Sequence, residues 1–311
     1  MAKNYLVIIG GPTAIGKTEM AIQLAKHFQT VIISADSRQI YKELNIGVAK
    51  PSIEQLIEVT HYFISSISIH QNYTAYDYQK DVHSLLPTLF QKHPIVIMTG
   101  GTGFYINAIL KGLDEIPSVS QKTKILIHQL YKEKGIQFLQ EELQEKDPEY
   151  FAKVDIHNPV RLLRALEVIY ETQKPFSYFL NNKKKNNNYF QPINLWMNSS
   201  REILYQRINQ RVDKMIEMGL EEEVMELYPY RHLNALNTVG YKEWWSYIEN
   251  DNIDIQAITE LIKRNTRHYA KRQITWFKHQ WDAKEFYLSD LLNSNTFFDE
   301  LVSFVKSKIN D

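Results

Sequence analysis

The chain opens with an apolar run, a glycine-rich loop and an amphipathic segment in direct succession. Residues 5–9 are apolar and rich in β-branched side chains, which predicts a buried parallel strand. In residues 19–28 the apolar side chains recur at the spacing of an amphipathic helix. The loop between them, GPTAIGKT, fits the pattern G-x-x-x-x-G-K-[ST] of a phosphate-binding loop. It consists of Gly11, Pro12, Thr13, Ala14, Ile15, Gly16, Lys17 and Thr18. This succession predicts an α/β fold with a P-loop NTPase-like core.

The loop predicts a binding site for phosphate groups. Its glycines allow backbone N–H groups to surround a phosphate, and the start of the following helix adds a favourable dipole. Lys17 supplies a mobile positive charge, and the hydroxyl of Thr18 can bind Mg²⁺. The pattern does not distinguish a nucleoside triphosphate from another diphosphate ester, because both present the same oxygens.

The remaining core pattern alternates strands and helices. Residues 31–33 and 95–98 are short apolar runs, and residues 75–92 between them have a helical pattern. Residues 193–197 could return the chain to the sheet, followed by helices at 201–218, 220–228 and 255–280. We therefore expect a parallel sheet flanked by helices, with ligands bound beyond the carboxyl ends of the strands.

The middle of the chain has a different pattern. From residue 117 onward, helical periodicity as in residues 125–131 and 159–170 replaces strand character. The polar basic stretch NNKKKNNN at 181–188 cannot pack a core and is expected to form a loop. We predict a helical insertion domain at 117–192, between core segments 1–116 and 193–311.

A carboxylate follows one predicted core strand. Residues 95–98 end in TGGTG, which lacks the acidic residue that holds Mg²⁺ in motor proteins and GTPases. Asp36 lies just beyond the 31–33 run. It could bind the metal, act as a general base, or only cap the segment that follows it.

Composition narrows the class of protein. Hydrophobic residues make up 44% and charged residues 23%, as in soluble globular proteins. The absence of cysteine excludes disulfides and thiolate chemistry and fits a cytoplasmic location. No signal peptide and no run of about 20 apolar residues is present, so we expect no membrane partner. The 36 basic and 36 acidic residues cancel, so local patches would have to hold a polyanion. The ten histidines lack metal-binding spacing.

Seven segments together resemble the tRNA dimethylallyltransferase family, in the family's order and over nearly the whole chain. They are GPTAIGKT (11–18), SADSRQIYKELNIGVAKP (34–51), TGGTGFY (99–105), NPVRLLRALEV (158–168), RVDKMIEMGLEEEV (211–224), TVGYKE (238–243) and TRHYAKRQITWF (266–277).

The resemblance implies transfer of a dimethylallyl group from dimethylallyl diphosphate to a tRNA. The acceptor would be the exocyclic amine of the adenosine 3′ of the anticodon, in tRNAs that read codons starting with U. The phosphate loop would hold the diphosphate, with Mg²⁺ bound by Thr18, while Lys17 and Arg211 would stabilise the charge on this leaving group. Asp36 matches the family's base, and Thr102 matches a residue that contacts the tRNA near the reacting base.

The resemblance also implies contacts with the tRNA anticodon stem-loop, from which the base must be flipped. Ser37, Arg38 and Gln39 continue the segment that reads the adenine after Asp36. In the insertion the contacts would come from Lys124, Val160, Arg161, Leu162, Leu163 and Arg164. Val160 stands where a glutamine is common, and Lys124 where an arginine is usual.

The long helix at 255–280 carries basic residues together with Tyr269, Trp276 and Phe277. We interpret the aromatic residues as an inner, core-facing stripe and the basic residues as an RNA-facing surface. The protein is expected to act as a monomer.

Two other functions fit the phosphate loop. A small-molecule or nucleoside kinase would use it for ATP, and a non-catalytic RNA-binding protein would retain the loop without turnover.

Overall fold

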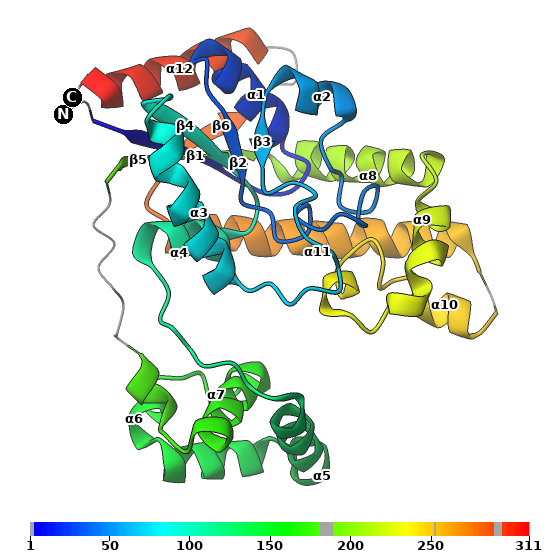
Figure 1. Cartoon of the computed structure of the whole chain (residues 1–311). Coiled ribbons are helices and arrows are strands. Elements are labelled where there is room, and N and C mark those ends of the chain that lie inside the picture. Colours follow the sequence, from blue (N-terminus) through cyan, green and yellow to red (C-terminus); the bar gives the residue numbers. More distant parts are fainter. Residues whose placement is uncertain (1–2, 181–188, 252, 289–293, 311) are drawn as a thin grey trace. The chain divides into compact units, whose positions relative to one another are not determined.

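The computed structural model describes residues 3–180, 189–251, 253–288 and 294–310 (Figure 1). The chain divides into two compact units. The first consists of Met1–Leu110 and Asn187–Asp311, and the second of Lys111–Asn186.

A six-stranded parallel sheet forms the centre of the first unit. Its strand order is β3-β2-β4-β1-β5-β6, and every neighbouring pair is parallel. The strands are β1 (Tyr5–Gly10), β2 (Ile32–Ser34), β3 (His61–Tyr62), β4 (Ile95–Thr99), β5 (Gln191–Ser199) and β6 (Lys284–Leu288). Because β1 is flanked by β4 and β5 and buried along its whole length, the phosphate loop that follows it starts at the middle of the sheet. The predicted P-loop NTPase-like α/β core is confirmed.

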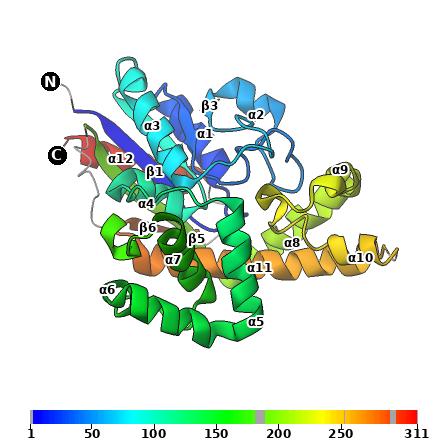
Figure 2. The same ribbon diagram turned by 60° about the horizontal axis from the view of Figure 1, so that its bottom comes forward.

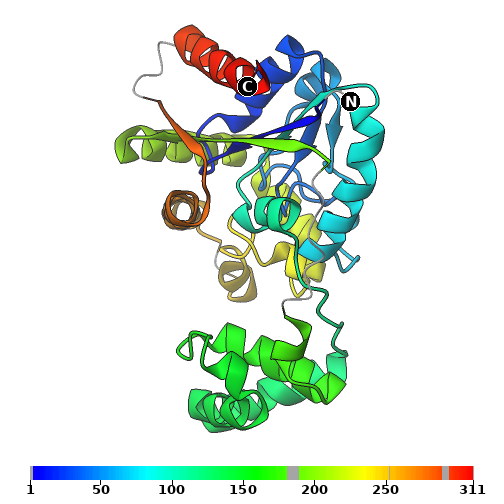
Figure 3. The ribbon, with the colours of Figure 1, turned by 90° about the vertical axis from the view of Figure 1, so that its left-hand side faces the viewer.

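Helices cover both faces of this sheet. The odd-numbered side chains of β1 pack with α1 (Lys17–His27) and α12 (Ser294–Asn310). The even-numbered ones pack with α3 (Ala75–Phe90) and α4 (Gly103–Lys111) on the other face. Figure 3 shows α1 and α12 together on one side of the sheet. The alternation follows from the two-residue period of a strand buried on both faces.

A second core lies beyond the carboxyl ends of the strands. It is built from α8 (Arg201–Glu217), α9 (Leu220–Leu227), α10 (Trp245–Glu249) and the first half of α11 (Ile255–Gln280). Helices α8 and α11 lie side by side (Figure 2). Tyr241 and Trp244 are fully buried in this core, which also packs against the chain after β2. The short helices α2 (Ile53–Glu58), η2 (Tyr228–Tyr230) and η3 (Asn234–Leu236) complete the unit.

The second unit is entirely helical within its described residues. It contains α5 (Gln121–Lys146), α6 (Pro148–Phe151), α7 (Pro159–Thr172) and η1 (Phe176–Phe179) around one apolar core. Gly135, at φ 74° and ψ −171°, breaks α5 into two segments, a conformation open only to glycine. This unit spans 111–186 instead of the predicted 117–192, because Gln191 and Pro192 already pair with β1. The basic stretch 181–188 lies outside the described residues.

Most of the sheet and its helices follow the sequence pattern. The predicted strands at 5–9, 31–33 and 95–98, the return at 193–197 and the helices at 201–218, 220–228 and 255–280 are present within a few residues. Strands β3 and β6 and the last helix had not been predicted. No helix in the described ranges is long and apolar enough to cross a membrane.

Candidate active site

The phosphate loop joins β1 to α1 in a conformation that requires its glycines. Gly11 has φ 144° and Gly16 has φ 101°, and Ala14 between them is also left-handed at φ 62°. A Cβ on Gly11 would lie 2.6 Å from the carbonyl oxygen of Met197, so a side chain there would collide with β5. Gly16 precedes α1 without capping it by a side chain, which leaves the first amides of the helix open to an anion.

Lys17 is an incompletely neutralised cation in this loop. Its Nζ donates a hydrogen bond of 2.7 Å to the carbonyl oxygen of Pro12. Burial and, to a smaller extent, the positive charge of Arg211 lower the pKa of Lys17 to about 7, while the negative charge of Asp36 acts in the opposite direction. A phosphate group beside Lys17 would supply the missing negative charge.

Two arginines of α8 reach the same loop. Arg211 donates a hydrogen bond of 3.0 Å from Nη1 to Oγ1 of Thr13. Burial and the nearby charge of Arg207 lower the pKa of the Arg211 guanidinium. Arg207, which the sequence did not predict as a site residue, adjoins Gly16. Its Nη2 lies 3.2 Å from the position that a Cβ on Gly16 would occupy. Lys17, Arg207 and Arg211 thus form a trio of cations suited to a diphosphate.

Asp36 follows β2 and faces the loop across the edge of the sheet. Its Oδ1 accepts hydrogen bonds from the backbone amides of Arg38, at 2.8 Å, and Gln39, at 3.2 Å. Within the described part of the chain Oδ2 has no hydrogen-bond donor. The carboxylate therefore caps a turn with one oxygen and keeps the other free for a ligand.

The residues next to Asp36 are held by protein contacts. Oγ1 of Thr102 accepts a hydrogen bond from the amide of Ser37 at 3.1 Å. The guanidinium of Arg38 donates to the carbonyl oxygens of Asn234 and Ala235. Ser37 and Arg38 are thereby brought to one wall of the site, whereas Thr102 supports that wall from behind.

Gln39 has a similar supporting position. Its Nε2 donates to the carbonyl oxygens of Val48, at 3.2 Å, and Ala49, at 2.9 Å. The side-chain amide of Gln39 therefore fixes the loop at residues 48–49, and its Nε2 already donates both of its hydrogens to the protein backbone.

Two cavities of about 330 Å³ each meet at Asp36. One is lined by the phosphate loop, including Lys17 and Thr18, and by Arg207, and we call it the diphosphate-side cavity after the ligand that the sequence predicts for this loop. The other is lined by Ser37, Arg38, Arg272 and the segment 237–240, and we call it the base-side cavity after the predicted adenine contacts of residues 37–39. Both cavities share the lining residues Thr13, Asp36, Val48, Ala49, Arg211 and Tyr269. Thr102 lines neither of them.

Tyr269 belongs to this site and not to the core-facing stripe predicted for its helix. The residue is 37% exposed and lines both cavities. Burial of its hydroxyl, with the negative charge of Asp36 nearby, raises the pKa of Tyr269 to about 12. The interpretation is correct for Phe277, which is fully buried. Tyr269 differs because α11 runs past the end of the sheet there, so this turn of the helix faces a cavity.

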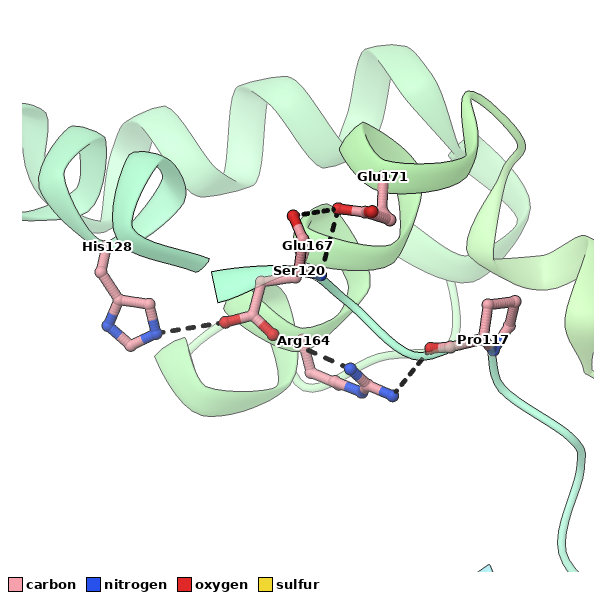
Figure 4. A network of polar contacts seen from close by, with 6 residues as sticks. All are labelled: Pro117, Ser120, His128, Arg164, Glu167 and Glu171. Carbon is pink, nitrogen blue, oxygen red and sulfur yellow. Dashed lines mark hydrogen bonds and ion pairs between the residues drawn. The ribbon is translucent and has the colours of Figure 1, made fainter. Parts of the chain in front are cut away.

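In the helical unit, Arg164 is part of a polar network around a buried carboxylate (Figure 4). Glu167 is 7% exposed and lies 3.2 Å from Nε2 of His128 and 3.9 Å from Nη1 of Arg164. Nη2 of Arg164 donates to the carbonyl oxygen of Pro117. The guanidinium is therefore fixed on its inner side, while 42% of the side chain stays exposed.

The predicted tRNA-contact run on α7 separates into two kinds of residue. Val160, 72% exposed, and Arg161 are on the surface of the helix. Leu162 and Leu163 are buried in the core of this unit, so any contact of these two residues with RNA would have to come from their backbone. An amphipathic helix must turn some members of a four-residue run inward. Lys124, on α5, is half-buried.

The sheet order, the strand–loop–helix geometry and the cationic trio define a P-loop protein of the α/β class. A model of the IPP transferase family matches residues 39–280. The chain is 48% identical to the tRNA dimethylallyltransferase of Christiangramia forsetii, over 99% of each chain. It is 46% identical to that of Flavobacterium johnsoniae, over 98% of this chain and all of the relative. The crystal structure of the full-length tRNA isopentenylpyrophosphate transferase from Bacillus halodurans is 30% identical, with a TM-score of 0.72 over 99% of this chain and 97% of that one. The chain belongs to the IPP transferase family.

Proposed function

We propose that this protein transfers a dimethylallyl group from dimethylallyl diphosphate to a tRNA. The acceptor is the exocyclic amine of the adenosine 3′ of the anticodon, in tRNAs that read codons starting with U. The names of the relatives support this chemistry. The observation that carries the proposal is the position of Asp36, which lines both a cationic cavity and the cavity beside it.

The two cavities suit the two substrates. The diphosphate-side cavity presents the loop amides, Lys17, Arg207 and Arg211 to the donor. The base-side cavity, with Arg38 and Arg272 on its wall, has room for a base flipped out of the anticodon loop. Donor and acceptor would then meet at the residues that both cavities share.

The reaction forms a bond between the adenine nitrogen and C1 of the dimethylallyl group and breaks the bond from C1 to the diphosphate oxygen. Negative charge develops on the diphosphate, where the cationic trio stabilises it. The amine loses one proton, which the carboxylate of Asp36 accepts through its free oxygen. The products are the prenylated tRNA and diphosphate.

The residues present fit a magnesium ion. Thr18 brings a hydroxyl oxygen to the diphosphate-side cavity, and hard oxygen donors are the ligand type that Mg²⁺ prefers. The described residues contain no group of three or more His, Cys, Asp or Glu side chains arranged for a metal. We therefore propose that Thr18 holds the ion and that the diphosphate and water complete its shell. When bound, Mg²⁺ would neutralise charge on the leaving group.

The helical unit is proposed to bind the anticodon stem-loop. Arg161 and the exposed face of Arg164, both on α7, suit phosphates. Val160 lies on the same helix, and Lys124 lies on α5. A tRNA substrate and the absence of cysteine support a cytoplasmic location. We propose that the monomer is active.

The experiment combines the protein with labelled dimethylallyl diphosphate, Mg²⁺ and unmodified tRNA. Digestion of the RNA to nucleosides should find the label on the adenosine 3′ of the anticodon. Consumption of ATP without labelling of RNA would instead identify a kinase. Binding of tRNA with neither reaction would identify a non-catalytic RNA-binding protein.

A further inference from the structure

A glutamine of α11 connects two loops at the end of the sheet. Gln273 is 7% exposed. Its Oε1 accepts a hydrogen bond of 2.9 Å from the amide of Thr13, in the phosphate loop. Its Nε2 donates one of 2.9 Å to the carbonyl oxygen of Gly101, in the turn after β4. The two loops follow the neighbouring strands β1 and β4, and Gln273 spans the gap between them.

The neutral amide suits this bridge. One end must accept a hydrogen bond while the other donates one, which a carboxylate or an alkyl side chain cannot do. Gly101 has no room for a side chain, because an added Cβ would lie 2.3 Å from Nε2 of Gln273. The glycine after β4 is thus explained by the close approach of Gln273.

Each end of the bridge leads to a group assigned to the reaction. On the diphosphate side, Thr13 also accepts the hydrogen bond from Arg211. On the other side, Gly101 precedes Thr102, which accepts from the amide of Ser37, next to Asp36. The helix that carries Gln273 is itself fixed, since a Cβ on Gly10 would lie 2.4 Å from the ring of Phe277.

We propose that Gln273 is a positioning residue that sets the distance between the diphosphate cradle and the general base. This inference rests on the proposed function. Gln273 lines the diphosphate-side cavity, but its two polar ends are already bonded to protein. Its contribution is to hold the donor carbon at attacking distance from the amine, and not to bind either substrate.

A double-mutant cycle between Gln273 and Gly101 tests this relation by single-turnover transfer rates at saturating substrates. Gln273→Ala should lower the rate about 10- to 100-fold while tRNA and magnesium diphosphate affinities change less than about threefold. Gly101→Ala should lower the rate in the natural background. Combined with Gln273→Ala, it should lower the rate much less, because the side-chain amide with which the new Cβ collides is gone. The matched control is Gly47→Ala, whose Cβ would collide with Tyr241 instead of Gln273. This change should lower the transfer rate by the same factor in the natural and the Gln273→Ala backgrounds.

Hydrogen–deuterium exchange of the phosphate-loop peptide provides a readout independent of turnover. Exchange should be faster in Gln273→Ala than in the natural protein and unchanged in Gln280→Ala, an exposed site on the same helix. A natural rate in Gln273→Ala, equal costs of Gly101→Ala in both backgrounds, or unchanged exchange would each overturn the inference. If the natural protein transfers no label, the proposed function fails, and the exchange result alone decides whether Gln273 fixes the loop. If Gln273→Ala does not fold, Gly101→Ala on the natural background must still accelerate exchange.

Discussion

The hydroxyl of Tyr241 donates a hydrogen bond of 2.6 Å to Oε1 of Glu223. The same carboxylate accepts hydrogen bonds from three consecutive amides, those of Asn45, Ile46 and Gly47. Burial and the charge of Glu223 both raise the pKa of Tyr241, which keeps the hydroxyl protonated as a donor. Glu223 thus fixes the loop whose residues 47–49 line the base-side cavity.

Glu223→Gln should weaken this loop. The amide loses the charge that strengthens four hydrogen bonds and brings an NH₂ group towards other donors, so the free energy of unfolding should fall by about 1–3 kcal/mol. The KM for tRNA should rise more than that for dimethylallyl diphosphate, because the loop borders the base-side cavity. Denaturant unfolding and steady-state kinetics measure the two effects. Glu222→Gln, an exposed change on the same helix, is the control, and an equal effect there would contradict the assignment.

The low pKa of Lys17 predicts a pH-dependent affinity for diphosphate. Without ligand the lysine loses its proton as the pH rises above about 7, far below its ordinary value of 10.5. The ammonium form binds an anion better, so affinity should be highest below pH 7 and fall as the pH rises, with proton uptake on binding at pH 8. Calorimetry with magnesium diphosphate in buffers of different ionisation enthalpy measures both. Lys17→Met should bind more weakly and lack this proton uptake; an unchanged uptake would assign it to another group.

Asp36→Asn separates catalysis from folding. The amide oxygen of asparagine can still accept the turn hydrogen bonds from Arg38 and Gln39. The base is lost, so single-turnover transfer should slow by about 10²- to 10⁴-fold, while the Kd for magnesium diphosphate stays within about threefold. Loss of diphosphate affinity equal to the loss of rate would show that Asp36 acts on the donor and not on the amine.

The local patterns of the sequence were enough to predict those parts of the site that are continuous along the chain. The apolar run before Gly11 and the helical spacing after Lys17 predicted the phosphate loop, and the end of the 31–33 run predicted Asp36 beyond a strand. Arg207 and Gln273 could not be found in this way, because each resembles the other polar residues of an amphipathic helix. Their positions depend on how α8 and α11 pack across the end of the sheet. The burial of Leu162 could not be predicted from the resemblance, because a matched segment does not specify which face of a helix is buried.

Arg207→Gln should weaken diphosphate binding. The guanidinium adjoins Gly16, and its positive charge lies in the same cavity as Lys17 and Arg211. Its removal should raise the Kd for magnesium diphosphate about tenfold, in line with the loss of one charge-assisted contact. Arg201→Gln, an exposed change at the start of the same helix, should leave the Kd unchanged. If both variants bind equally well at low salt, Arg207 is only a surface charge beside the loop.

Adjacent residues of α7 should respond in opposite ways to truncation. Arg161 is exposed, so Arg161→Ala should leave the free energy of unfolding within about 0.5 kcal/mol and weaken tRNA binding. If Arg161 contacts a phosphate, the slope of log affinity against log salt should also fall by about one.

Leu162 is fully buried, so Leu162→Ala should lower the free energy of unfolding by about 2–5 kcal/mol. Below its melting temperature this variant should bind tRNA with an unchanged salt slope, because no charge has been removed. Thermal unfolding and salt-titrated tRNA binding measure the pair, and an unchanged slope in Arg161→Ala would remove this side chain from the proposed RNA surface.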